Sequence, residues 1–151
     1  MPIDSIGVVM SENIEHGGCL CRQFTYSFDR SAVQSGMHCH CRDCQKSTGS
    51  GKATIAFVPK KALSTEGVLK YFSVTGTDGA VVERGFCERC GSPVFSQIIG
   101  IEEMKDMMFI KAGSLDDASW LKIDVNIWES SAHPWSPVDG NLPSFKQNMK
   151  R

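Results

Sequence analysis

The sequence predicts a single, mostly-β domain that is held together by metal. Several short segments are rich in β-branched or aromatic residues and are bounded by Gly or Pro, which is typical of strands. Only two short stretches are expected to form a helical turn, and neither is long enough to define the architecture. The seven cysteines fall into three tight clusters. With 151 residues the chain has the length of one domain and can bury a core without disulfides.

The strands are predicted from local patterns along the chain. Residues 19–28 alternate, with Phe24, Tyr26 and Phe28 on one side, which indicates a half-buried strand. Residues 121–128 (LKIDVNIW) alternate in the same way. Four more strands are expected, at 52–59, 80–87, 93–99 and 106–112.

The remaining segments are expected to be short turns and extensions of the one domain, which spans residues 1–151. Residues 60–63 follow Pro59 and favour one helical turn, and residues 114–120 favour a second short helix capped at Ser114. Residues 1–14 are interpreted as an N-terminal extension. Residues 129–151 contain three prolines and are interpreted as an irregular C-terminal tail that wraps over the sheet.

The charge balance argues against a polyanionic partner. Sixteen Lys and Arg oppose seventeen Asp and Glu, which gives a formal charge of -1, and no run of five like charges occurs. We therefore expect no nucleic-acid partner. The N-terminus is too acidic for a signal peptide and no apolar run approaches the roughly 20 residues of a membrane span. The expected protein is cytoplasmic and does not bind a membrane.

The outer cysteine clusters have the spacing of zinc ligands. Seven is an odd number, so in a chain without an export signal reduced thiolates that bind metal are favoured over disulfides. Cys19 and Cys21 would face the same way on an extended strand. Cys87 and Cys90, followed by Gly91, form a CxxCG motif that is typical of a zinc knuckle. Together the two pairs supply four thiolates, the number that a closed structural zinc site needs.

The central cluster supplies only three sulfurs. Cys39, Cys41 and Cys44 form a CxCxxC motif with no fourth cysteine left over, which favours an open, catalytic type of zinc site. His38 or His40 could complete the coordination. If the segment is extended, however, both histidines and Arg42 point away from Cys39 and Cys41, which weakens that alternative.

Two alternatives stay open at the level of spacing. Cys19 and Cys21 could share a metal with members of the central cluster instead of with Cys87 and Cys90. Any single cysteine could also be a small core residue, because free cysteine is often buried. Asp43, Lys46 and Lys52 are expected to be solvated charges, and Trp128 and Trp135 are expected to be core or lid aromatics.

The motifs resemble those of a known family. The matching stretches are GCLC at 18–21, HCHCRDC at 38–44 followed by Gly49, FCERCGS at 86–92, NIW at 126–128, PW at 134–135 and LP at 142–143. In this order they are similar to the glutathione-dependent formaldehyde-activating enzymes, a family that includes centromere protein V and has the Mss4-like fold. The resemblance covers almost the whole chain.

The resemblance implies both a fold and a ligand assignment. It implies short antiparallel strands in two or three small sheets that are stapled by zinc. It also implies two Zn²⁺ ions per chain. One is a structural ion on Cys19, Cys21, Cys87 and Cys90, and the other is a catalytic ion on Cys39, Cys41 and Cys44. The sequence departs from the family at Arg22, where glycine is usual, and at residues 42–47 around the third central cysteine.

The implied activity is that of a carbon–sulfur lyase. In the family, glutathione and formaldehyde join to give S-hydroxymethylglutathione, so a small thiol and a small aldehyde are the expected partners. Three thiolates make zinc a weak Lewis acid that is better suited to activating a thiol than water. Arg42, Lys46 and Lys52 are candidates for binding the carboxylates of a thiol peptide. The alternative is a non-catalytic zinc-binding module that interacts with another protein.

Overall fold

A computed structural model describes residues 13–149. The predicted N-terminal extension, residues 1–14, lies outside the described part up to residue 12. No helix within residues 13–149 is both long and apolar enough to cross a membrane. The described chain consists mainly of short strands with one short α-helix and several 3-10 turns, so the mostly-β prediction is confirmed.

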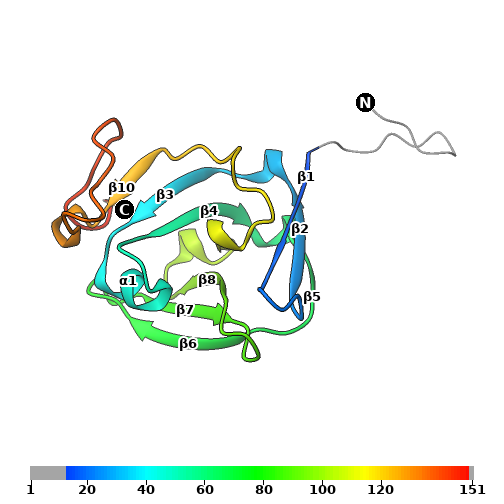
Figure 1. Ribbon diagram of the computed structural model, residues 1–151. Coiled ribbons are helices and arrows are strands. Elements are labelled where there is room, and N and C mark those ends of the chain that lie inside the picture. Colours follow the sequence, from blue (N-terminus) through cyan, green and yellow to red (C-terminus); the bar gives the residue numbers. More distant parts are fainter. Residues whose placement is uncertain (1–12, 150–151) are drawn as a thin grey trace, which may run out of the picture.

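The strands form two sheets (Figure 1). The smaller sheet is antiparallel, in the order β1-β2-β5, with bounds β1 Ile14–Gly18, β2 Thr25–Asp29 and β5 Ser64–Glu66. The larger sheet has seven strands in the order β10-β3-β4-β9-β8-β7-β6. Its bounds are β3 Ser35–Cys39, β4 Ala53–Pro59, β6 Lys70–Thr75, β7 Val81–Phe86, β8 Pro93–Ile99, β9 Met107–Lys111 and β10 Val125–Ile127.

All pairs in the larger sheet are antiparallel except β10 with β3, which is parallel. The single α-helix, α1 (Arg42–Thr48), follows β3 directly. Cys41 caps its N-terminus, and Gly49 ends it with φ 71, a left-handed conformation that glycine adopts at little cost. The 3-10 turns are η1 Arg30–Ala32, η2 Lys60–Ala62, η3 Glu102–Met104, η4 Ala112–Ser114 and η5 Glu129–Ser131.

Successive side chains on a strand point to opposite sides, so the two faces of the larger sheet have different surroundings. One face packs against the smaller sheet through an aromatic cluster. Phe95 of β8 contacts Phe24 edge-on, with ring centroids 5.5 Å apart, and Tyr26 of β2 at 4.9 Å. Ala56, Val58 and Ile110 complete this core. The other face bears Met37, Ile55 and Phe109, and it lines a cavity.

Several predicted elements are confirmed and others need correction. Strands β4 and β8, and the turn η2, lie where their local patterns placed them. The predicted strand 19–28 is wrong in its first half, because residues 19–24 form a tight turn and β2 begins at Thr25. The predicted helix 114–120 is also wrong, since the only helical turn there, η4, precedes it and ends at Ser114. In 121–128 only the last part, β10, is a strand.

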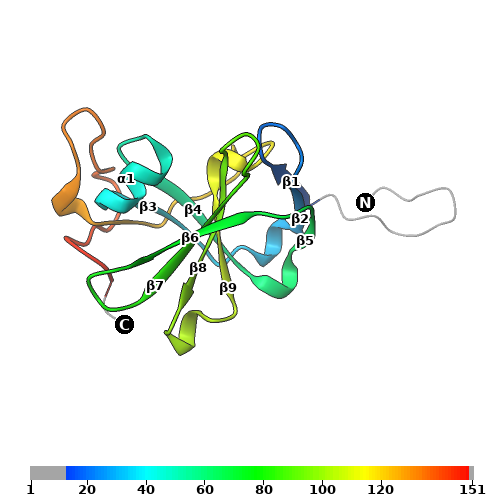
Figure 2. The same cartoon turned by 90° about the horizontal axis from the view of Figure 1, so that it is seen from below.

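The C-terminal segment returns to the sheet beside β10, at the end of the molecule opposite the β1–β2 hairpin (Figures 1 and 2). Asn126 exchanges backbone hydrogen bonds with this segment, since its N–H donates to the carbonyl of Pro143 at 2.9 Å and its carbonyl accepts from Phe145 at 3.0 Å. The Trp128 N–H donates to the carbonyl of Gln147 at 3.1 Å. These bonds hold the segment beside the cavity described below.

Candidate metal centres and the adjoining cavity

Four cysteines from two turns form the first cluster. Cys19 and Cys21 lie in the turn after β1, and Cys87 and Cys90 lie in the turn after β7. Their sulfur atoms all lie within 4.8 Å of one another, close enough to hold a metal ion. The Sγ atoms of Cys19 and Cys21 are 3.6 Å apart, and those of Cys21 and Cys87 are 3.7 Å apart.

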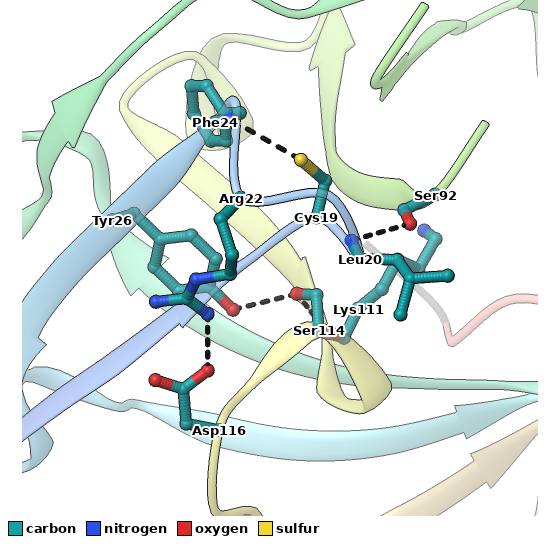
Figure 3. A network of polar contacts seen from close by, with 9 residues as sticks. All are labelled: Cys19, Leu20, Arg22, Phe24, Tyr26, Ser92, Lys111, Ser114 and Asp116. Atoms are coloured by element: carbon teal, nitrogen blue, oxygen red, sulfur yellow. Dashed lines mark hydrogen bonds and ion pairs between the residues drawn. The ribbon is translucent and has the colours of Figure 1, made fainter. Parts of the chain in front are cut away.

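Hydrogen bonds within and around the two turns hold the four sulfurs in place. The N–H of Phe24 donates to Cys19 Sγ at 3.3 Å (Figure 3). Gly91 has φ 77, and its N–H donates to the carbonyl of Cys87 at 2.7 Å, which closes the knuckle predicted from the CxxCG motif. Hydrogen bonds from the hydroxyl and backbone N–H of Ser92 lower the pKa of the Cys90 thiol to about 5. A lowered pKa favours the thiolate form of Cys90, which is the form that binds metal.

The turn at residues 19–24 is held by hydrogen bonds that the predicted extended strand would not form. The Arg22 N–H donates to the carbonyl of Cys19 at 3.0 Å, and the Cys19 N–H donates to the carbonyl of Phe24 at 3.0 Å. The Leu20 N–H donates to Ser92 Oγ at 2.9 Å, which ties this turn to the second one (Figure 3). Cys19 and Cys21 therefore face one another because the chain turns, and not because they alternate on a strand.

The second cluster consists of Cys39, Cys41 and Cys44. Cys39 ends β3, Cys41 is the N-cap of α1, and Cys44 lies in the first helical turn. Their sulfurs lie within 4.8 Å of one another, and the Cys44 N–H donates to Cys41 Sγ at 3.3 Å. The structure thus places the outer pairs together and the central three together, which is one of the arrangements that spacing left open.

Neither neighbouring histidine belongs to the three-cysteine cluster. His38 Nδ1 forms a hydrogen bond with Thr54 Oγ1 at 2.9 Å on the neighbouring strand. His40 is fully buried, burial lowers its pKa, and neither of its ring nitrogens has a hydrogen-bond partner within the described residues. Arg42 departs from the expectation that it points away from the cysteines, because the chain turns into α1 and Arg42 lines the same cavity as they do.

A cavity of about 550 Å³ adjoins the three-cysteine cluster. It lies on one face of the larger sheet, and six strands contribute side chains at alternate positions, which the register brings opposite one another. Trp128 and Met149, from the C-terminal part, also line it. The lining residues from the strands are Met37, Cys39, Ile55, Phe57, Val82, Arg84, Ser96, Ile98, Phe109, Lys111 and Ile127.

Two basic side chains project into the cavity from its mostly apolar sheet wall. Lys111 is only 6% exposed, and its Nζ donates to Ser96 Oγ at 3.0 Å. Ser96 is the register partner of Arg84 on the next strand. The Nε and Nη1 atoms of Arg84 are buried and have no hydrogen-bond partner. Neither Arg84 nor Lys111 was predicted from the sequence. The two-residue spacing of Phe109 and Lys111 does predict that these two side chains share one face of strand β9.

The positive side chains act on the cysteines electrostatically. The pKa of the Cys44 thiol is lowered to about 2, mainly because Cys39 and Cys41 donate hydrogen bonds to its sulfur, and the charges of Lys111 and Arg84 act in the same direction. Burial lowers the pKa of Lys111, and the charge of Cys44 opposes that effect. The Cys44 sulfur, Lys111 and Arg84 therefore line one cavity.

The carboxylate-binding candidates from the sequence divide between the cavity and the surface. Arg42 and Asp43 line the cavity at its helical edge. Lys46 and Lys52, which the structure also describes, do not line it. The polar groups that face the cysteines from the sheet are instead Arg84, Ser96 and Lys111. Strand pairing brings these three residues to the cysteines. They lie far from residues 39–44 in the sequence, so they could not be predicted from the motif.

The backbone of Lys111 is anchored from the opposite side of the sheet. Ser114 Oγ donates to the Lys111 carbonyl at 2.7 Å, so its only proton is used there. The Tyr26 hydroxyl, 2.7 Å from Ser114 Oγ, must then be the donor of that second bond (Figure 3). The backbone of Lys111 is thereby tied to strand β2, while its side chain lines the cavity of the three-cysteine cluster.

Comparisons with known proteins agree with the resemblance in the motifs. Residues 14–131 match the family described as "Glutathione-dependent formaldehyde-activating enzyme". Among solved structures, the crystal structure of a Rhodobacter sphaeroides protein from a structural genomics programme is similar, with a TM-score of 0.52 and 16% identity over 86% of this chain and 98% of that chain. At that identity the likeness shows the fold alone. No curated protein matches the chain.

Proposed function

We propose a function from one premise: the chain belongs to the glutathione-dependent formaldehyde-activating enzyme family. The proposed activity is that of a zinc-dependent carbon–sulfur lyase-type enzyme, which acts on the adduct of a thiol and an aldehyde. Glutathione and formaldehyde, which combine to S-hydroxymethylglutathione, are the substrates that the family name suggests. In the lyase direction the adduct's hydroxyl loses its proton, a carbonyl forms, and the carbon–sulfur bond breaks with its electron pair passing to sulfur, which takes up a proton.

The observation that carries this proposal is the contrast between the two cysteine clusters. The four-cysteine cluster has the full ligand number of a structural zinc site. The three-cysteine cluster has one ligand fewer and adjoins a cavity large enough for a small substrate. We assign Cys19, Cys21, Cys87 and Cys90 to a structural zinc, and Cys39, Cys41 and Cys44 to a second, open zinc. When bound there, zinc would supply a free coordination position at which a thiol loses its proton below its usual pKa of about 8.5.

The side chains around the open cluster favour an anionic partner. Three thiolates and one divalent ion carry a net charge of about -1. Lys111 and Arg84 add two positive charges inside the same cavity. Arg42 and the carboxylates of Asp43, Asp78 and Glu103 line the cavity as well, so the attraction to an anion is local. It comes from Arg84 and Lys111, which lie on either side of Ser96 on neighbouring strands. Because Lys111 is buried, its attraction for an anion is stronger than that of a lysine at the surface.

Cobalt substitution tests the proposal directly. Cobalt bound to thiolates absorbs visible light, and we expect glutathione to change the bands of one of two sites, whereas S-methylglutathione should not. Cys44→Ala should remove the responsive bands and leave those of the four-cysteine site. Lys46→Ala, an exposed position on the same helix, is the matched control and should respond as the natural protein does.

The catalytic part of the proposal needs a second measurement. Exchange between formaldehyde and its glutathione adduct can be followed by NMR, and the zinc-loaded protein should accelerate it while Cys44→Ala should not. If thiols leave the cobalt spectrum unchanged and a fourth protein ligand is found at that ion, the non-catalytic zinc-binding module becomes the better interpretation.

A further inference from the structure

The cavity combines features that a purely structural interior would not retain. Its wall on the sheet is formed mainly by aliphatic and aromatic side chains, yet Arg84 and Lys111 project from the same strands. Arg42 and three carboxylates, Asp43, Asp78 and Glu103, line other parts of the cavity. Lys111 has three donor hydrogens, and one hydrogen bond, to Ser96, is made by its Nζ. Arg84 buries Nε and Nη1 without a partner. Burying an unpaired polar or charged group is unfavourable, so these donors need an acceptor from outside the chain.

The described residues supply no hydrogen-bond partner for Arg84 Nε and Nη1, and the hydrogen bond of Lys111 Nζ goes to the neutral hydroxyl of Ser96. Within residues 13–149, neither Arg84 nor Lys111 forms an ion pair with a carboxylate. The thiolates of the cysteine cluster offset part of the charge. Metal-bound thiolates can accept N–H···S hydrogen bonds, but within the described residues Arg84 Nε and Nη1 form none with these sulfurs. The free donors therefore point to an oxygen anion as the missing partner.

The position of the two cations defines where such an anion would lie. Arg84 and Ser96 are register partners on β7 and β8, and Lys111 reaches Ser96 from β9. The three polar groups thus converge on one patch of the sheet. Around the patch lie Ile55, Phe57, Val82, Ile98 and Phe109. An anionic head with an apolar chain fits this arrangement, whereas an ammonium group would be repelled.

We propose that Arg84, Lys111 and Ser96 form a carboxylate-binding site, which holds a substrate whose remaining part is an apolar carbon chain. The inference deepens the proposed function, on which it rests for the reaction only, by naming the substrate class: a thiol–aldehyde adduct with a carboxylate on an apolar chain. Arg84 and Lys111 are specificity-determining residues in this assignment. Ser96 orients the ammonium group of Lys111.

Hexanoate is a suitable probe because it carries the head and the chain without a thiol or an aldehyde. Calorimetric titration of the zinc-loaded protein should show binding of hexanoate and at least about tenfold weaker binding of hexanamide, which has the same chain but no charge. Hexylamine should not bind. Equal affinity for hexanoate and hexanamide, or no binding of hexanoate, would overturn the proposal.

Variants separate recognition from folding. Arg84→Gln and Lys111→Met should each weaken hexanoate binding at least about tenfold and leave hexanamide binding unchanged. Arg84→Lys should retain an intermediate affinity, because it keeps the charge and loses the planar fork. Lys61→Met is the matched control for Lys111→Met, since Lys61 is exposed and remote from the cavity lining, and it should bind as the natural protein does. Unchanged affinity in Arg84→Gln would also refute the proposal.

The outcomes distinguish this inference from the proposed function. If hexanoate binds as expected but thiols never alter the cobalt bands, the carboxylate site stands and the lyase proposal fails. If glutathione alters the cobalt bands but hexanoate binds no better than hexanamide, the lyase proposal stands and the carboxylate site is refuted.

Discussion

Arg22 forms an ion pair with Asp116, with 2.7 Å between Nη1 and Oδ1, from a backbone that is in the left-handed region at φ 65 (Figure 3). Both side chains are about half exposed. Glycine, which the resemblance in the motifs leads us to expect here, would adopt this conformation without a Cβ to clash. In this chain, the ion pair accompanies a residue that is less suited to the turn.

Replacing Arg22 tests whether backbone or side chain dominates at this turn. Arg22→Gly relieves a left-handed strain of about 1 kcal/mol. It also loses an exposed ion pair worth at most about 1 kcal/mol, and glycine increases the conformational entropy of the unfolded chain, which destabilises the folded protein. We expect a change in unfolding free energy within about 1 kcal/mol. Arg22→Val loses the pair and places a β-branched residue at positive φ, so it should lose about 2 kcal/mol. Thermal unfolding of the zinc-loaded proteins measures both; equal losses would mean that the ion pair, not the backbone, controls the turn.

The four-cysteine cluster should be required for folding. A structural zinc supplies roughly 10 to 16 kcal/mol of apparent binding free energy, which is comparable to the whole stability of a domain. Cys87 is buried and joins a turn after β7 to the start of the chain. Cys87→Ser should therefore unfold the protein or make it insoluble, as circular dichroism and solubility would show. A soluble variant with two zinc ions and an unchanged Tm would contradict the assignment.

The two clusters should lose metal in sequence. The three-cysteine cluster is expected to exchange its ion more readily, because it has one ligand fewer and adjoins a cavity. Mild chelation should remove one equivalent of zinc with circular dichroism unchanged, and stronger chelation should remove the second with loss of the fold. Simultaneous release of both ions together with unfolding would show that the division into structural and open sites is wrong.

We expect the buried Lys111 side chain to lower the stability of the folded protein. Its side chain is buried in an apolar wall, and replacing a buried charge by an apolar side chain of similar volume often stabilises a protein. Lys111→Met should raise the unfolding free energy by about 1 kcal/mol or leave it unchanged, whereas it weakens carboxylate binding. Thermal unfolding of Lys111→Met is compared with that of the control variant Lys61→Met and of the natural protein. A loss of more than about 1 kcal/mol confined to Lys111→Met would identify Lys111 as a structural residue.

Elements with a local pattern were predicted well from the sequence, and elements without one were missed. Strands β4 and β8 have apolar, β-branched runs with clear boundaries, and both lie where expected. Strand β6 at the sheet edge was missed because it is almost wholly exposed and has no buried face to create an alternation. The seven residues of α1 are too few for a helical period.

The sequence by itself determined that the chain has cysteine clusters suited to metal, and through its motifs it indicated the family. These properties depend on residues within six or seven positions of one another, so they are visible without a fold. Tertiary structure decided which clusters meet, because Cys21 and Cys87 are far apart in the chain and their sulfurs come within 3.7 Å only when two turns are held together. It also decided the character of the cavity. A lysine in a strand is ordinarily solvated, and only the pairing of β9 with β4 and β8 buries Lys111 opposite the three cysteines.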